Sequence, residues 1–308
     1  MTTLSTLTKA RCRWLAKLGS RQKRYGYVLV APAVLVLLLL TVYPSLYMLF
    51  VSFYDWAIVA TIPRRFVGLG QYLWMVRDPD FRGAILVTVI FVMGVVLVEM
   101  VGGFILAMLL FTDSRGIRRL RFAFLIPTII APVVVGLTWR WMLSADLGVI
   151  NYLIGLLGIS KIGWLAKPLP ALLSVMLVDI WQWTPFTMFI MLAGLESLPV
   201  EFFEAAYVDG ASPWQVVRYI ILPMLIPVII IALMFRTLDA FKTFDIIYIV
   251  TRGGPAHATN VLSYNVWRKG FFENNLGYAA ALSVVMIILA TVMTQVYIRV
   301  LTRVRRTT

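Results

Sequence analysis

The sequence predicts an all-α integral membrane protein with six transmembrane helices and a helix–turn–helix loop on the cytoplasmic face. Three observations support this fold class. Hydrophobic residues make up 61% of the 308 residues and charged residues only 14%, whereas a soluble domain is nearer half apolar and a quarter charged. The apolar residues fall in long blocks, and a bilayer core needs only about 20 helical residues. The basic residues, which give a net charge of +14, gather on one side of these blocks.

Six apolar segments are expected to cross the membrane. They are Tyr25–Tyr54, Gly83–Thr112, Phe122–Trp139, Pro168–Ser197, a segment from Tyr219 onward and Asn274–Ile298. The first is too long to be the apolar core of a cleavable signal peptide. We therefore expect a six-span domain over residues 25–300, with a polar loop at about 195–223. A basic tail at 1–24 is either an interfacial helix or disordered, and 301–308 form a C-terminal tail.

The charge distribution predicts the orientation. Sixteen Lys and Arg residues lie in the N-terminal tail, the loop after the second segment, the C-terminus and at Arg218, whereas the opposite loops hold nine. Cytoplasmic loops carry the excess of basic residues. Both termini are therefore expected in the cytoplasm, and the positive charge reflects membrane topology rather than nucleic-acid binding.

The sequence offers little for catalysis or metal binding. It contains one cysteine, Cys12, and one histidine, His257, on opposite sides of the predicted membrane. No intrachain disulfide can form, and no Cys/His spacing fits a zinc site. We expect no catalytic residues, no metal site and no enzymatic activity in this chain. A membrane enzyme would need a nucleophile–base pair or a metal cluster.

The polar loop between the fourth and fifth segments contains "EAAYVDGASPWQVVRYIILP", residues 204–223. A helix is expected to begin after Pro199, with Glu201 and Glu204 near the positive end of its dipole. Asp209-Gly210 breaks it, because glycine tolerates the left-handed conformation that ends helices. Ser212-Pro213 then reads as an N-cap followed by proline in the first turn of a second helix. Connections usually take 2–8 residues, so this longer loop suggests partner docking, with an ordinary connection as the alternative.

This loop resembles the "EAA" signature of ABC importer permeases, the membrane subunits of binding-protein-dependent uptake systems. The match consists of Glu204-Ala205-Ala206, then Gly210, then Ile220-x-Leu222-Pro223. The resemblance implies that the loop forms coupling helices that fit a cleft of a cytoplasmic ATPase. The coupling positions it implies are Glu204, Ala205, Ala206, Asp209 and Gly210. The chain has no Gly-Lys dipeptide and so no Walker A loop, which places ATP and Mg on a separate ATPase dimer.

Further motifs resemble the carbohydrate permeases of the maltose-permease type. They are "TRGGPAHATNVLSYNVWRKGF", residues 251–271, and the following "LGYAAALSV". The resemblance implies a bacterial inner-membrane importer that moves sugar by alternating access. It also implies a second homologous permease as a heterodimer partner and an extracytoplasmic sugar-binding protein. The stretch "RTLDAFKTFDIIY" resembles permeases for trehalose or α-glucosides. The large periplasmic insertion and extra leading spans of the enterobacterial maltose permease are absent.

Ionisable residues within the apolar segments need a reason, because charges in a membrane are costly. They are Glu99, Asp179, Arg236, Asp239, Lys242 and Asp245. Arg236, Asp239 and Thr243 share one helical face. Lys242 and Asp245 lie on another face, where they could pair with each other. A structural ion-pair network is the alternative to a substrate site.

The fourth segment carries "DIWQWTPFTMF", which combines hydrogen-bonding and aromatic groups suited to a sugar. Pro185 is expected to kink the helix and free backbone carbonyls. By resemblance, the sugar-contact positions are Gln182, Trp183, Phe186, Arg236, Asp239, Ala240 and Thr243. The tryptophans could instead pack the bundle or form an interfacial belt. An ABC permease for a polyol or glycerol phosphate, and an ion-coupled carrier that protonates Asp179 or Asp239, remain alternative functions.

Overall fold

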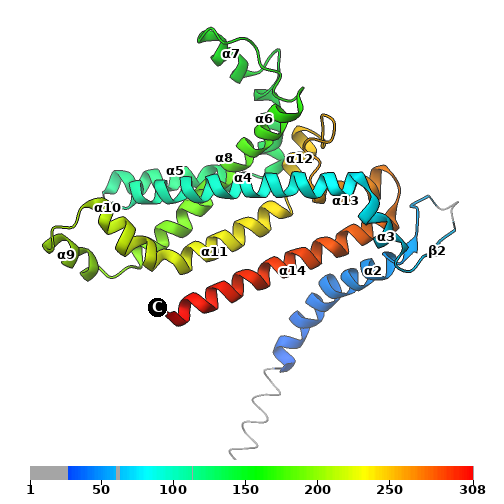
Figure 1. Ribbon diagram of the computed structural model, residues 1–308, viewed down its shortest axis with the longest axis horizontal. Coiled ribbons are helices and arrows are strands. Elements are labelled where there is room, and N and C mark those ends of the chain that lie inside the picture. The colour runs from blue at the N-terminus through cyan, green and yellow to red at the C-terminus, as the bar shows by residue number, and fades with distance from the viewer. Residues whose placement is uncertain (1–26, 60–62, 113, 308) are drawn as a thin grey trace, which may run out of the picture.

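The computed structural model describes residues 27–59, 63–112 and 114–307, and they form an almost entirely helical protein. Figure 1 shows long helices side by side, with a two-helix knob at one end and a small hairpin at the other. Five helical segments among the described residues are long and apolar enough to cross a membrane, or six if one bent pair counts as a single crossing. The predicted all-α membrane protein is therefore confirmed, whereas the expected N-terminal interfacial helix and Cys12 lie outside the described residues.

The first segment, Tyr27–Val51, stands apart from the bundle. It runs through a π-helical stretch, η1 (Leu38–Val42), into α2 (Tyr43–Val51). Only 6% of its most apolar stretch is buried. At its end, α2 packs against the last helix of the chain (Figure 1). The chain then forms a hairpin of β1 (Tyr54–Asp55) and β2 (Arg65–Phe66), followed by α3 (Gly70–Arg77). This segment therefore turns most of its apolar surface outward.

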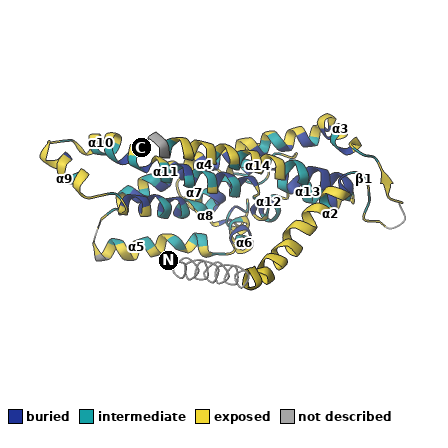
Figure 2. Cartoon of the chain, turned by 90° about the horizontal axis from the view of Figure 1, so that it is seen from below, coloured by how far each residue is buried: buried dark blue, intermediate teal, exposed yellow. Residues whose placement is uncertain are grey.

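The centre of the bundle is formed by α4 (Pro79–Leu110), α8 (Pro168–Glu196), α11 (Leu222–Phe241) and α14 (Leu276–Thr307). Figure 2 shows the buried residues gathered where these helices meet and the exposed ones on their outer faces. Small residues allow α4 and α8 to approach closely, as is common in membranes. A Cβ at Gly103 would lie 2.2 Å from Thr187 Oγ1, and that hydroxyl donates to the carbonyl of Glu99 at 2.8 Å.

The third predicted crossing, Phe122–Trp139, falls on two helices that meet at a sharp bend. The chain forms α5 (Arg115–Ile129) and α6 (Pro132–Met142), and their axes differ by 89°. The residue before a proline avoids the helical region. Accordingly Ala131, before Pro132, has an extended ψ of 134°, and Ile130 has 133°. An arm with α7 (Val149–Leu156) then leads to α8.

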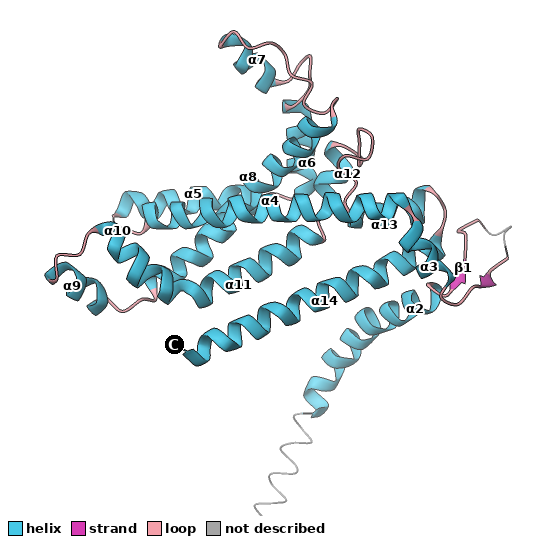
Figure 3. Cartoon of the chain, in the orientation of Figure 1, coloured by secondary structure: helices cyan, strands magenta, loops and turns pink. Residues whose placement is uncertain are grey.

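The knob contains α9 (Glu201–Val208) and α10 (Pro213–Val216), as Figure 3 shows. Gly210 has φ +72°, and Ala211 N donates to Ala206 O at 2.9 Å, which closes a Schellman-type helix end. Ser212 accepts from Gln215 N while the Gln215 side chain accepts from Ser212 N, a complete capping box. The predicted helix boundaries of this loop are therefore present, and η2 (Val217–Ile221) leads into α11.

The fifth apolar segment also breaks, at Lys242–Phe244, after which α12 (Asp245–Val250) continues in a new direction (Figure 1). A loop with left-handed residues Arg252 and Gly253 leads to α13 (Leu262–Trp267) and η3 (Arg268–Phe272). A Cβ at Gly253 would lie 2.4 Å from the Tyr264 ring, so only glycine fits there. The break positions the start of α12 beside α6 and α8.

Candidate functional site

Arg236 lies at the centre of a charge cluster in the membrane-spanning core. It projects from α11 and is completely buried. Its Nε and Nη2 donate to the two carboxylate oxygens of Glu99 on α4, at 2.6 and 2.8 Å. Nη2 also donates to Asp179 of α8 at 2.8 Å, and Nη1 to Asp239 at 2.9 Å. Because a buried charge needs partners, one guanidinium holds three helices together.

The cluster has more acids than one arginine can neutralise. Lys242 supplies a second cation, whose Nζ lies 3.2 Å from Asp239 Oδ1. The pairing of Lys242 with Asp245 that the sequence allowed does not form. Lys242 is the C-cap of α11 and lies one turn after Asp239, whereas Asp245 begins α12 beyond the break. The buried Oδ1 of Asp179 has no hydrogen-bond partner among the described residues.

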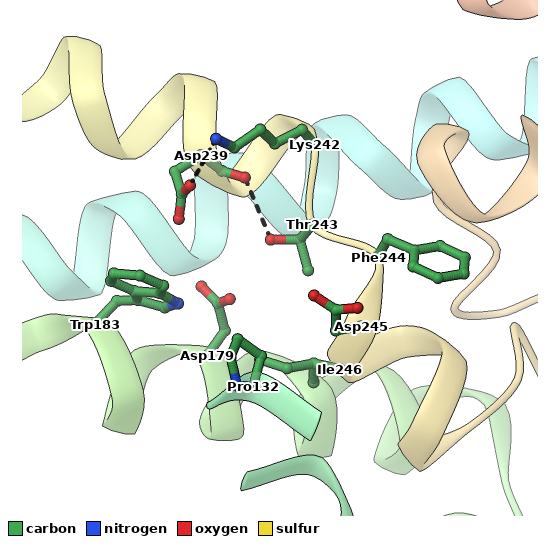
Figure 4. A pocket seen from close by; sticks show the side chains of 9 residues that line it. All are labelled: Pro132, Asp179, Trp183, Asp239, Lys242, Thr243, Phe244, Asp245 and Ile246. Atoms are coloured by element: carbon green, nitrogen blue, oxygen red, sulfur yellow. Dashed lines mark hydrogen bonds and ion pairs between the residues drawn. The ribbon is translucent and has the colours of Figure 1, made fainter. Parts of the chain in front are cut away.

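A cavity of about 300 Å³ opens beside this cluster. It is lined by Pro132, Asp179, Trp183, Asp239, Lys242, Thr243, Phe244, Asp245 and Ile246. Figure 4 shows the carboxylates of Asp179, Asp239 and Asp245 directed into the same space, with the Trp183 ring on one side. Its volume is at the low end of the range of small-molecule sites, about 300–1,000 Å³. The site thus combines acceptor oxygens with one aromatic face.

The predicted substrate positions take different places around this cavity. Trp183, Asp239 and Thr243 line it. Arg236 lies beneath it, with its guanidinium 5.1 Å from the centre of the Trp183 ring. Phe186 packs edge-on against Trp183, with ring centroids 6.1 Å apart. These positions remain predictions as sugar contacts.

Gln182 and Ala240 are buried outside the cavity lining. The Gln182 Nε2 donates to the Ile130 carbonyl at 3.1 Å, at the bend between α5 and α6. Thr128 Oγ1 donates to the Gln182 carbonyl at 2.9 Å. The helix α8 continues through Pro185. On either side of the proline, the Thr184 hydroxyl donates to the Ile180 carbonyl and the Thr187 hydroxyl to the Thr184 carbonyl. Trp181 points elsewhere and packs edge-on against Trp139 at 5.6 Å.

Sequence reasoning did not place Asp179, Lys242 and Asp245 among the site residues, although it noted them as intramembrane charges. Their presence in a hydrophobic segment was the available signal. Pro132, Phe244 and Ile246 were missed altogether. They reach the cavity because α6 and α12 both begin at breaks of the helix, which the sequence analysis treated as continuous spans.

The knob presents the predicted coupling residues at the surface. Glu204, Ala205, Asp209 and Gly210 are exposed, whereas Ala206 is buried. A hollow between α9 and α10 is lined by Ala205, Ala206, Asp209 and Gly210 together with residues of α10 and η2. Tyr207 and Val208 are more than four-fifths exposed. Exposed apolar side chains on a polar knob are typical of a docking surface.

Arg121 ties the base of the knob to the bundle. Its Nη1 donates to Glu196 Oε1 at 2.6 Å, at the end of α8. Its Nε and Nη2 donate to the Leu110 carbonyl at 3.1 and 2.8 Å, at the end of α4. Phe111 and Phe203 add a contact between α4 and α9, with ring centroids 6.3 Å apart. Arg121, in the middle of α5, thus joins the ends of α4 and α8, and the two phenylalanines join α4 to the start of the knob.

No group of three or more His, Cys, Asp or Glu side chains among residues 27–59, 63–112 and 114–307 is arranged to hold a metal ion.

Residues 120–306 match the family of binding-protein-dependent transport system inner membrane components. This match covers more than half of the chain, including the knob and the cavity. The chain belongs to this family. It is a permease subunit, and ATP hydrolysis in such systems is carried by a separate ATPase subunit.

The curated relatives agree over nearly the whole chain. The trehalose/maltose permease MalF of Thermococcus litoralis is 34% identical, covering 92% of this chain and 96% of the relative. The trehalose permease SugA of Mycobacterium tuberculosis is also 34% identical, over 92% and 91%. The sulfoquinovosyl glycerol permease SmoG of Agrobacterium fabrum is 34% identical, over 94% of both. The predicted ABC importer permease is confirmed, and these relatives are sugar permeases.

Among solved structures, a bacterial ABC transporter that imports the acidic polysaccharide alginate has the same fold. Its matched chain gives a TM-score of 0.80 at 22% identity, over 93% of this chain and 99% of that chain. A second structure contains the alginate transporter with its periplasmic protein bound to an alginate pentasaccharide, with a TM-score of 0.78 at 20% identity. The family and fold establish a multi-pass inner-membrane protein of a binding-protein-dependent ABC system, which works with permease and ATPase partners.

Proposed function

We propose that this permease moves a carbohydrate, such as trehalose or an α-glucoside, into the cytoplasm by alternating access. The observation that carries the proposal is the cavity beside Arg236. It combines the Trp183 face with the acceptor oxygens of Asp179 and Asp239. Sugars offer apolar C–H faces to aromatic rings and hydroxyl donors to carboxylates. The trehalose and maltose relatives support the same substrate class.

The knob of α9 and α10 is proposed as the coupling element that the ATPase grips. Glu204, Ala205, Ala206, Asp209 and Gly210 are the proposed contact positions. Tyr207 and Val208 beside them would be covered by the docked ATPase rather than left in water. The Arg121 contacts would transmit its movement to α4 and α8.

The proposed topology has six crossings, counting α5 and α6 as one, with both termini in the cytoplasm. In support, the end of α14 lies toward the knob end of the bundle, opposite the hairpin (Figure 1). The partners proposed are a second homologous permease, a cytoplasmic ATPase dimer carrying ATP and Mg, and a sugar-binding protein. Exposed Trp141, Leu147 and Tyr152 on α6 and the α7 arm offer the second permease an apolar surface.

The coupling role is tested by uptake of labelled trehalose and maltose into vesicles that contain the assembled transporter. Gly210→Pro is incompatible with φ +72°, since proline fixes φ near −65°. Glu204→Lys reverses an exposed charge on α9. Both should abolish uptake while assembly in the membrane persists. Asp55→Lys, the same reversal on an exposed residue of the hairpin at the other end of the bundle, is the control and should transport normally.

Full uptake by both knob variants would remove the coupling assignment. Transport that continues without the ATPase would favour an ion-coupled carrier instead. The orientation has a separate test in a Cys12→Ser background. Val208→Cys should react with an impermeant thiol reagent only from the cytoplasmic side, and Asp146→Cys only from outside. The reverse pattern would overturn the proposed topology.

A further inference from the structure

The cavity and the charge cluster beside it contain more acids than bases. Four acids and two bases line the cavity or form ion pairs beside it. When all six are ionised, this group has a net charge of two negative units. The six residues are Glu99, Asp179, Arg236, Asp239, Lys242 and Asp245.

Arg236 does not provide a free site for an anion. Its Nε, Nη1 and Nη2 all donate to carboxylates, and the side chain has no exposed surface. An anionic ligand in the cavity would meet Asp179 and Asp239 before it reached the guanidinium. The arginine is therefore a counter-ion that holds the acids in place, since separating it from them would leave buried charges unpaired.

Lys242 is also engaged. Its ammonium lies 3.2 Å from Asp239, although its side chain is 72% exposed at the edge of the cavity. Asp245, on the other side of the cavity, forms no ion pair or hydrogen bond among the described residues. Asp179 Oδ1 likewise lacks a donor. The exposed Asp245 carboxylate thus presents acceptor oxygens to a ligand with hydroxyl donors, and Asp179 Oδ1 is a buried acceptor in the cavity wall.

We infer that this chain's half of the site selects saccharides by charge, admitting neutral or cationic sugars and rejecting anionic ones such as uronates, sulfonates and phosphates. The inference rests on the proposed carbohydrate function and narrows its substrate class. The fold alone does not set this charge, because a transporter of the acidic polysaccharide alginate has it too. Under this proposal, Asp179, Asp239 and Asp245, the acids that line the cavity, determine the charge of the sugar that the site accepts. The glycerol phosphate alternative is disfavoured on the same ground.

The size of the effect follows from electrostatics. A like charge a few ångströms from a carboxylate in a partly buried site is repelled, and a tenfold loss of affinity corresponds to about 1.4 kcal/mol. Each neutralised carboxylate should therefore reduce the discrimination against an anionic sugar by about tenfold. A neutral sugar should lose only the hydrogen bond that the missing charge strengthened.

The test uses the assembled complex of both permeases and the ATPase, without the sugar-binding protein, so that only the membrane site selects. Labelled trehalose is displaced by unlabelled trehalose or by trehalose with one C6 hydroxymethyl group oxidised to a carboxylate. The wild type should prefer the neutral sugar by at least about tenfold. Asp245→Asn, which breaks no ion pair among the described residues, should reduce that preference about tenfold, and Asp239→Asn should act in the same direction. Asp55→Asn removes an exposed acid of the hairpin, outside the cavity lining, and should leave the preference unchanged.

Equal binding of the two sugars by the wild type, or an unchanged preference in both cavity variants, would overturn charge selection while leaving carbohydrate transport intact. Stronger binding of the uronate than of trehalose would do the same. Failure of the wild-type complex to bind or transport any neutral or anionic saccharide would instead overturn the proposed function itself. The two failures are therefore distinct.

Discussion

Two charge clusters in this molecule differ in burial and in balance. The core cluster around Arg236 is buried between three helices and has more acids than bases. The outer cluster, formed by Asp80, Arg268, Lys269 and Glu273, joins the start of α4 to η3. It has two acids and two bases, and its acids are about one-third exposed. The outer cluster has equal numbers of acids and bases and holds two elements together. The core cluster has an excess of acids beside a cavity, so some of its carboxylate oxygens can accept hydrogen bonds from a ligand.

The outer cluster has further support that is purely structural. The Tyr278 hydroxyl donates to Asp78 Oδ2 at 2.7 Å and fixes α14 beside the same helix start. None of the four residues of the outer cluster lines the cavity beside Arg236. The comparison indicates that charge alone does not identify a site in this membrane protein. What distinguishes the core cluster is unsatisfied charge next to open volume.

The largest expected effect is on the core cluster. Arg236→Met would leave Glu99 and Asp179 buried without their cation, which should cost about 3–5 kcal/mol of stability. The measurement is unfolding of the purified complex by heat or SDS. Adding Glu99→Gln should recover part of the loss, because it removes one of the stranded charges. If Arg236→Met alone changed the free energy of unfolding by less than about 1 kcal/mol, the buried ion pairs would not stabilise the fold as described.

The next effect concerns the base of the knob. Arg121→Ala would remove donors to the α4 carbonyl end and to Glu196, at a cost of about 1–3 kcal/mol. The more specific readout is the number of ATP molecules hydrolysed per sugar transported. That ratio should rise, because movement of the knob would reach α4 less directly. Arg121→Lys should restore the ratio in part. An unchanged ratio in the alanine variant would reduce Arg121 to a structural role.

A smaller effect is expected in the outer cluster. Asp80→Asn removes the carboxylate that accepts from both Arg268 and Lys269, in a part-exposed setting. Such pairs contribute about 0–1 kcal/mol. Transport and sugar selectivity should be unchanged. A loss comparable with that of Arg236→Met would erase the contrast between the two clusters.

The smallest effect is in pH dependence. Burial disfavours the charged form of Lys269, but the Glu273 and Asp80 carboxylates outweigh it and hold the pKa of this lysine above its usual value. A raised pKa stabilises the fold fully below the unfolded pKa, about 10.4, and the gain is lost as pH rises through the folded value. The difference in stability between wild type and Lys269→Met should therefore stay constant from about pH 6 to pH 9. A change within that range would show that Lys269 titrates there.

Local signals predicted the knob well, and distant contacts explain why the cavity was harder to predict. The Asp209-Gly210 break and the Ser212-Pro213 start depend on neighbouring residues, so the sequence specifies them directly. Apolar blocks likewise predicted the long helices. The cavity is built from α6, α8, α11 and α12, and two of these begin at breaks inside apolar stretches.

Helical spacing also misled the prediction at Lys242. A face assignment assumes a continuous helix, but the helix ends at Phe241 and restarts at Asp245. Asp239 therefore became the partner of Lys242. Pro132 carried a usable signal, since the residue before proline tends to leave the helix. Applied to Ala131, that rule would have located the bend, although not the helix that packs against it.

The bend at Ile130–Ala131 separates two helices with different neighbours. The helix α5 packs on α8, whereas α6 packs mainly on α12. Pro132, the first residue of α6, lines the cavity. Because no continuous helical hydrogen-bond ladder runs through this two-residue joint, the cavity wall at Pro132 can shift with α12 without carrying α5 along.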